Sequence, residues 1–158
     1  IRDSIITAGA SGIGLETAKA FLNCNSLVAI CDIDQDALKK VKEEYPDIHT
    51  EFCDVANATD TKNFIKSTAK KLAGIDTHVN NAGNAGPTNK IEDVSSEEWS
   101  KCLDVCLSAQ FNCIKASVPY LKESDNLLKS DHAKPNGVFN KAKTSLVGNV
   151  KFYKVDIT

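Results

Sequence analysis

The sequence contains no methionine, although it is 158 residues long. Ordinary protein composition would supply a few methionines in a chain of this length. We therefore expect either a processed fragment or a sequence from which residues of the natural polypeptide are missing. The length suits one domain with a substantial core and is too short for two.

Long apolar runs and blocks of one charge are also absent. No apolar run approaches the roughly 20 residues that a membrane-spanning helix needs. The net charge is only −2 and the sequence has no basic cluster. These features argue against membrane and nucleic-acid partners, and no charged and apolar leader precedes the first strand-like run. We expect a cytoplasmic protein.

Six cysteines are present, but no CxxC pair occurs and no histidine lies nearby at metal-ligand spacing. They are Cys24, Cys31, Cys53, Cys102, Cys106 and Cys113. Several of them fall in apolar strand-like runs or recur at helical spacing, which is typical of packed side chains. We therefore expect free and mostly buried thiols, no metal site and a reducing compartment.

The first half of the chain alternates short apolar runs with helical patterns. This alternation predicts βαβ units around a parallel sheet. Strands are expected at residues 4–8, 27–32, 48–53 and 76–80, and helices at residues 12–23, 34–44 and 59–73. The fold class is therefore α/β, a Rossmann-type doubly wound parallel sheet in three αβα layers, forming a single domain over residues 1–158.

A long helix is predicted over residues 98–121, because Ser95 and Glu98 have the spacing of a capping box. Its apolar stripe consists of Trp99, Leu103, Leu107, Phe111, Ile114, Val118 and Leu121. Core packing is the expected role of such a stripe, and an oligomer interface is the alternative. Beyond it, residues 124–137 are polar, and a short helix at about 140–147 precedes a strand-like run at 151–157.

The segment that joins the first predicted strand to the first helix reads Thr-Ala-Gly-Ala-Ser-Gly-Ile-Gly over residues 7–14. A pyrophosphate needs backbone amides that no side chain obstructs, and the positive end of a helix dipole favours it. Gly12 and Gly14 suit close approach and tight helix packing, while Ser11 can add a hydroxyl donor. A simple tight turn is the alternative, but the strand before and the helix after favour a dinucleotide site.

Asp32 ends the second predicted strand, 18 residues after Gly14. A carboxylate at this place can accept hydrogen bonds from both hydroxyls of an adenosine ribose, and it repels a 2′-phosphate. No lysine or arginine between residues 31 and 36 offsets that repulsion. Asp32 therefore favours NAD over NADP, whereas Asp34 is better placed to cap the next helix.

Together these residues resemble the short-chain dehydrogenase/reductase family. Residues 7–14 match its T-G-x-x-x-G-x-G motif, except that Ala8 replaces the first glycine, and residues 80–83 match its N-N-A-G motif. Asp54 and Val55 are similar to its adenine-contacting pair, and the long helix is similar to its fourth helix. The resemblance, over residues 4 to about 122, implies cofactor contacts from Gly9, Ser11, Gly12, Ile13, Gly14, Asp32, Ile33, Asp54, Val55, Asn81, Ala82, Gly83 and Lys143.

The catalytic set that the resemblance implies is incomplete. The family uses the Tyr and Lys of Y-x-x-x-K, a Ser on the fifth strand and an Asn in the long helix. Here Lys143 is retained, but Phe139 stands at the Tyr position and Cys106 at the Asn position. Phenylalanine cannot donate a proton. A fifth strand with its Ser is not recognisable, and His132 is more typical of a solvated loop residue than of a substitute acid.

The resemblance implies an NAD(H)-dependent oxidoreductase that transfers hydride between the cofactor and a small-molecule alcohol or carbonyl substrate. It also implies a homo-oligomer, either a dimer or a tetramer. The segment from about 122 to 158 is expected to be degenerate or incomplete. Two alternatives remain at this point, a catalytically inactive NAD-binding pseudoenzyme and a truncated interaction fragment.

Overall fold

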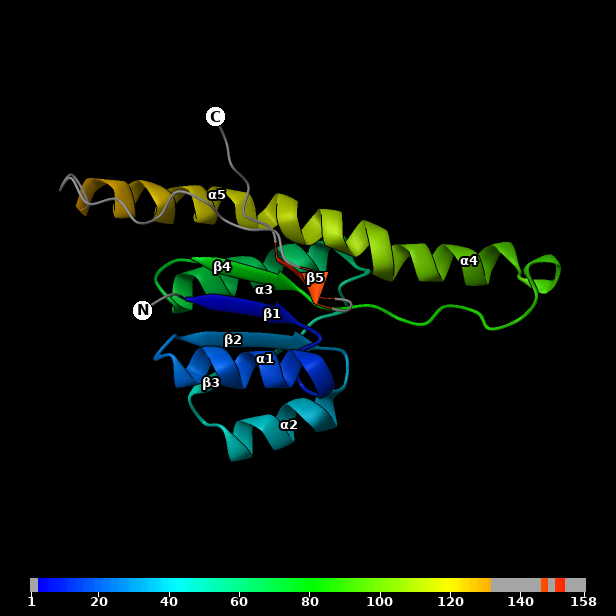
Figure 1. The fold of residues 1–158 in the computed structure, drawn as a ribbon, viewed down its shortest axis with the longest axis horizontal. Coiled ribbons are helices and arrows are strands. Elements are labelled where there is room, and N and C mark those ends of the chain that lie inside the picture. The colour runs from blue at the N-terminus through cyan, green and yellow to red at the C-terminus, as the bar shows by residue number, and fades with distance from the viewer. Residues whose placement is uncertain (1–2, 132–145, 148–149, 153–158) are drawn as a thin grey trace.

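The core of the fold is a parallel sheet of four strands (Figure 1). The computed structural model describes residues 3–131, 146–147 and 150–152, and the side chains of residues 3–123. The strands are β1 (Ser4–Thr7), β2 (Val28–Asp32), β3 (Ile48–Phe52) and β4 (Thr77–Asn80), in the order β3-β2-β1-β4. Ile6 lies opposite Ile30 on one side and Val79 on the other, which fixes the register.

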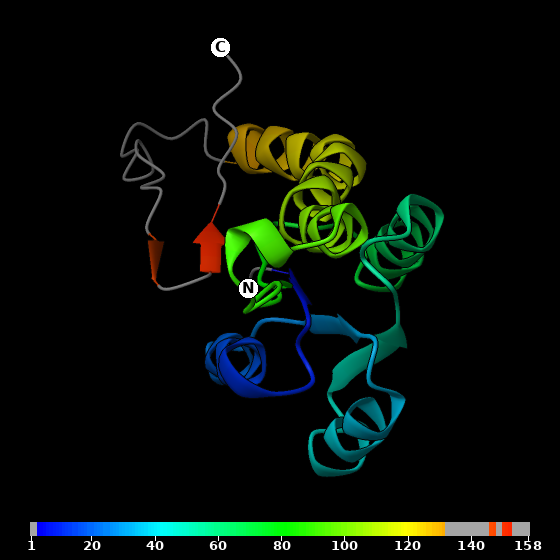
Figure 2. The same ribbon diagram turned by 90° about the vertical axis from the view of Figure 1, so that its right-hand side faces the viewer.

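Helices cover both faces of this sheet, as the view along it shows (Figure 2). They are α1 (Gly12–Asn23), α2 (Gln35–Glu44), α3 (Ala58–Lys71) and α5 (Ala109–Asp131). Successive side chains of a strand point to opposite faces. Ile6 therefore packs with the cluster beneath α1 and α2, while Ile5 packs with the one beneath α3 and α5. The predicted three-layer Rossmann-type architecture is confirmed, and the elements up to β4 lie within two residues of their predicted bounds.

The helices begin where the sequence provides a capping side chain. Asp34 accepts a hydrogen bond from Ala37 N at 3.0 Å, and Asn57 caps α3 in the same way. Ser95 and Glu98 form the predicted capping box at the start of α4 (Ser96–Leu103). These bonds satisfy backbone N–H groups that have no partner inside the helix.

The long helix runs along the sheet, and its α4 part extends beyond the carboxyl ends of the strands (Figure 1). A short 3₁₀ turn (Ile91–Asp93) precedes α4, and a π-helical segment (Asp104–Ser108) joins α4 to α5, which ends at Asp131. The expectation that its large apolar stripe packs in the core is wrong for most of the stripe: none of the seven residues is fully buried, and Trp99, Leu107 and Phe111 are exposed. Leu121 is partly buried and packs against the core. The buried face instead carries small side chains one turn apart, Ala109, Cys113 and Ser117, which let the helix approach α3 and β4 closely.

Two short strands, β5 (Leu146–Val147) and β6 (Val150–Phe152), continue the sheet beyond β4. β6 pairs with β4 and β5 in antiparallel orientation, so the described sheet is not parallel throughout. The predicted helix at 140–147 is wrong for its last two residues, which lie in β5. The rest of that helix, and the part of the predicted strand after residue 152, lie outside the described residues.

The thiols are free, but fewer are buried than expected. Cys31, Cys53 and Cys113 are buried, whereas Cys24 is exposed and Cys102 and Cys106 are partly exposed. Burial raises the pKa of the Cys113 thiol to about 12, as an apolar environment disfavours the thiolate. In the described part of the chain, no cluster of ligating side chains could hold a metal ion, and no helix is long and apolar enough to cross a bilayer.

Candidate functional site

The loop after β1 carries three glycines at positions where a side chain would be obstructed or would need a left-handed backbone. Gly12 has a left-handed φ of +52°, and a Cβ atom added to it would meet no atom within 4 Å. An added Cβ at Gly14 would lie 2.2 Å from the Ala8 carbonyl oxygen, and one at Gly9 would lie 2.6 Å from Ile30 Cβ. Gly9 and Gly14 thus permit close packing of the loop, whereas Gly12 leaves open space in front of the first turn of α1.

The open space lies at the N-terminus of α1, where unpaired N–H groups and the helix dipole favour an anion. Ser11 is the N-cap residue, yet its side chain makes no capping hydrogen bond, so its exposed hydroxyl can serve a ligand. Ile13 follows in the first turn and is 55% exposed. These features fit the phosphate end of a dinucleotide.

Asp32 lies at the end of β2, and its carboxylate is oriented by two backbone groups. One oxygen accepts a hydrogen bond from Ala10 N at 3.0 Å, and the other from Asp34 N at 3.1 Å. The first bond joins the carboxylate directly to the glycine loop. Asp34 caps α2 instead, so the two aspartates have separate tasks, and the neighbouring Ile33 is 63% exposed.

The Asn-Asn-Ala-Gly segment after β4 is tied to the end of β1. The buried Thr7 hydroxyl accepts hydrogen bonds from Asn81 N and Ala82 N, both at 3.0 Å. The Asn81 side-chain amide donates to the carbonyl oxygens of Thr7 and Ala8 at 3.1 and 3.0 Å. Hydrogen bonds between residues 74 positions apart therefore join the carboxyl ends of β1 and β4. The strand order changes direction between these two strands.

The long helix supports the same segment from the other side. Gln110 donates from Nε2 to the Ala82 carbonyl oxygen at 2.9 Å, and the Cys106 sulfur lies 4.0 Å from where a Cβ on Gly83 would stand. Sequence reasoning missed the roles of Thr7 and Gln110. The role of Gln110 could have been inferred from its position four residues after Cys106, because this spacing places both side chains on one face of a helix.

The remaining predicted residues are only partly brought to this edge. Asp54 accepts a hydrogen bond from Ala56 N at 2.9 Å in the turn after β3, while the Val55 side chain is buried against the α3 face of the core. Phe139, Lys143 and His132 lie outside the described residues.

A buried histidine lies behind the site, on β4. His78 is 6% exposed, and its Nδ1 atom is hydrogen-bonded to the buried Ser117 hydroxyl at 2.5 Å. Its Nε2 atom has no hydrogen-bond partner among the described residues. Burial lowers the pKa of His78 from 6.5 to about 4, so the ring is neutral at physiological pH.

The parallel strand order, the glycine loop after β1 and the aspartate at the end of β2 are those of a Rossmann-type fold. A family model described as short chain dehydrogenase matches residues 4–126, and the chain belongs to this family of oxidoreductases. The resemblance seen in the sequence is thereby confirmed.

Known relatives agree with this assignment. The L-fucose dehydrogenase of Bos taurus is 30% identical over 120 residues, which cover 76% of this chain and 44% of the relative. The 2-dehydro-3-deoxy-L-rhamnonate dehydrogenase (NAD(+)) of Sphingomonas sp. (strain SKA58) is 28% identical over 123 residues, or 78% and 49% of the two chains. The crystal structure of levodione reductase superposes with a TM-score of 0.72 at 26% identity, over 78% and 50%. The chain spans about half the length, or less, of these relatives.

Proposed function

We propose that this chain binds NAD(H) and serves an oxidoreductase reaction that moves hydride between the cofactor and an alcohol or carbonyl substrate. The observation that carries the proposal is the direct hydrogen bond between the Asp32 carboxylate and Ala10 N of the glycine loop. It joins the group that would receive the adenosine ribose to the turn that would receive the pyrophosphate. A bound nicotinamide cofactor would supply the hydride donor or acceptor.

The preference for NAD over NADP rests on the charge and position of Asp32. Its oxygens each accept one backbone hydrogen bond. A carboxylate oxygen has two lone pairs, so both keep capacity for ribose hydroxyls. A 2′-phosphate beside this carboxylate would be repelled, by up to roughly 4 kcal/mol for unit charges at contact in a surface-like dielectric.

The first experiment is a fluorescence titration of the protein with NADH and NADPH. Wild-type protein should bind NADH more tightly, and Asp32→Ala should weaken NADH binding by about 1–3 kcal/mol, the range for charge-assisted hydrogen bonds. NADPH binding should stay flat or improve. Asp34→Ala is the matched control, because it removes a neighbouring carboxylate that caps α2 and should leave both affinities unchanged. Equal wild-type affinities for NADH and NADPH would contradict the proposal.

A second candidate function is NAD binding without turnover. Phe139 and Cys106 stand where the family has its proton donor and its helix asparagine, and Lys143 alone of this set is retained. Loss of a general acid typically costs 10²–10⁴-fold in rate, and groups that act together are not additive. The candidate predicts NADH binding but no change in NADH absorbance with ketones, secondary alcohols or sugars such as L-fucose. Turnover by a chain of confirmed sequence and mass would exclude it.

We also propose that the chain is a homo-oligomer in a reducing, cytoplasmic compartment. Trp99, Leu107 and Phe111 are 52%, 63% and 61% exposed along the long helix. Large apolar side chains that lie together on a surface are typical of a protein–protein contact. The same helix face on a second copy would cover them in a two-fold arrangement. The free thiols fit a reducing environment.

A further inference from the structure

Two cysteines lie where the long helix meets the loop after β4. Cys102 is in the last turn of α4, and Cys106 is one turn further on, in the π-helical segment. Both are partly exposed, so small solutes can reach them, in contrast to the buried thiols of the core. Cys106 also occupies the position at which the family has asparagine, and the proposed function gives it no role.

The two sulfurs hold the turn of residues 84–86 against the helix. Asn84 N donates to the Cys106 sulfur at 3.4 Å, and the Cys106 thiol donates to the Asn84 carbonyl oxygen at 3.5 Å. Gly86 N donates to Asn84 Oδ1 at 3.0 Å, which closes the turn. Cys102 packs against the last residue of this turn, Gly86, because its sulfur lies 3.0 Å from where a Cβ on Gly86 would stand.

The two thiols also interact with each other. Burial, and then hydrogen bonding to Cys106, raises the pKa of the Cys102 thiol. Cys106 is the thiol whose sulfur also receives a backbone N–H, from Asn84 at 3.4 Å, so we assign it as the attacking thiol and Cys102 as the resolving one.

We propose that Cys102 and Cys106 form an oxidation-sensitive dithiol whose closure to a disulfide releases the turn of residues 84–86. The Cys106 thiolate attacks hydrogen peroxide, so that an S–O bond forms, the O–O bond breaks and hydroxide leaves. The Cys102 thiolate then attacks the Cys106 sulfur, so that the S–S bond forms, the S–O bond breaks and a second hydroxide leaves. The two protons lost by the thiols convert both hydroxides to water.

Helix geometry explains why such a bond would release the turn and remain reversible. Side chains four residues apart on a helix have Cβ atoms about 5–6 Å apart, whereas a disulfide needs about 3.5–4.5 Å. The backbone must shift to bring the two Cβ atoms together, and the π-helical segment that begins at Asp104 interrupts the regular α-helix at this point. A strained bond is readily reduced by thiols. Its closure also removes the Cys106 proton that is donated to Asn84.

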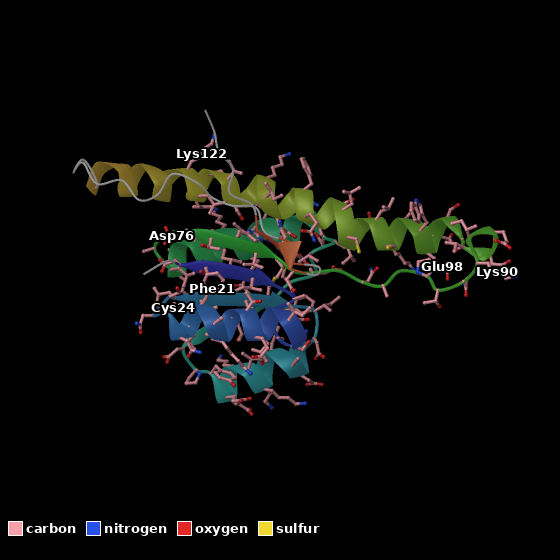
Figure 3. The ribbon with its side chains drawn as sticks, viewed as in Figure 1. Phe21, Cys24, Asp76, Lys90, Glu98 and Lys122 are labelled. Atoms are coloured by element: carbon pink, nitrogen blue, oxygen red, sulfur yellow. The ribbon has the colours of Figure 1, made fainter. Side chains whose placement is uncertain are left out.

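The experiment treats reduced protein with stoichiometric hydrogen peroxide and blocks the remaining thiols with iodoacetamide. Cys24→Ser is the matched control, since this exposed thiol lies at the far end of α1, remote from Glu98 and α4 (Figure 3). Wild type and Cys24→Ser should both lose two hydrogen atoms, with the bond mapped between Cys102 and Cys106 and reversed by dithiothreitol. The Asn84 N–H donates to the Cys106 sulfur in the reduced protein. If the turn is released, amide hydrogen exchange at Asn84 should become about 2- to 10-fold faster, the factor for one lost hydrogen bond.

Two further variants test the assigned roles. Cys102→Ser should stop at a dimedone-reactive sulfenic acid on Cys106, whereas Cys106→Ser should form neither a disulfide nor an adduct at Cys102. A bond to Cys113, sulfenic acid on Cys102, or unchanged exchange at Asn84 would each overturn the proposal. If a serine variant fails to fold by circular dichroism, the wild-type mapping and exchange still decide. None of these readouts depends on NADH binding, so the thiol chemistry is tested separately from the proposed function.

Discussion

Ala8 adopts a backbone conformation that glycine would adopt at lower cost. Its φ is +50°, in the left-handed region, at the position where the family motif has its first glycine. A non-glycine residue pays roughly 1–2 kcal/mol in this region. The conformation persists because the Ala8 carbonyl accepts a hydrogen bond from the Asn81 side chain at 3.0 Å.

Replacing Ala8 with glycine should relieve this strain. Glycine costs roughly 0.4–1 kcal/mol in unfolded-chain entropy, and a partly buried methyl group is lost. The net change should lie between neutral and about 1 kcal/mol more stable. Ala10→Gly is the matched control, because Ala10 belongs to the same loop, is 5% exposed and has no left-handed φ. Ala10→Gly has the same cost in unfolded-chain entropy but relieves no strain. The variant should therefore be less stable than wild type by about 1 kcal/mol or more.

The assay is urea denaturation followed by far-ultraviolet circular dichroism, with free energies of unfolding taken from the linear extrapolation. The two variants should differ by about 1–2 kcal/mol, mainly from the backbone strain at Ala8, because the entropy cost is common to both and each loses one methyl group. Equal losses of stability in Ala8→Gly and Ala10→Gly would refute the reasoning. They would mean that the loop relaxes around Ala8 without strain.

Three further predictions concern the site, the core and the long helix. Gly12→Val should abolish NADH binding in a fluorescence titration, whereas Gly74→Val, which also points into open space at a positive φ, should not. Because burial lowers the pKa of His78 from 6.5 to about 4, the unfolded chain takes up the proton at a higher pH than the folded chain. The free energy of unfolding should therefore fall by about 3 kcal/mol as the pH is lowered from 6.5 to about 4. The stability of His78→Leu in urea should lack this part of the pH dependence; an unchanged slope would contradict it. Leu107→Glu should lower the assembly state in sedimentation equilibrium, whereas the exposed Lys122→Glu should not.

Much of the fold was predictable because local chemistry and tertiary structure agree. Strand periodicity, the Asp34 cap and the capping box at Ser95 each act over a few residues, so the sequence displays them directly. Gly12 and Asp32 were also visible, because a phosphate-type turn and a carboxylate after the next strand occur at a fixed spacing in a βαβ unit. The separate tasks of Asp32 and Asp34 followed from the same spacing.

The sequence by itself determined the βαβ order and the glycines and the aspartate that follow β1 and end β2. Only the tertiary structure decided which helix face is buried, since close approach to α3 and β4 selects the small residues Ala109, Cys113 and Ser117 over the larger apolar stripe. It also decided the partners of Thr7 and Gln110, whose bonds span 75 and 28 residues. Contacts over such separations depend on the packing of whole elements, and no local pattern encodes them.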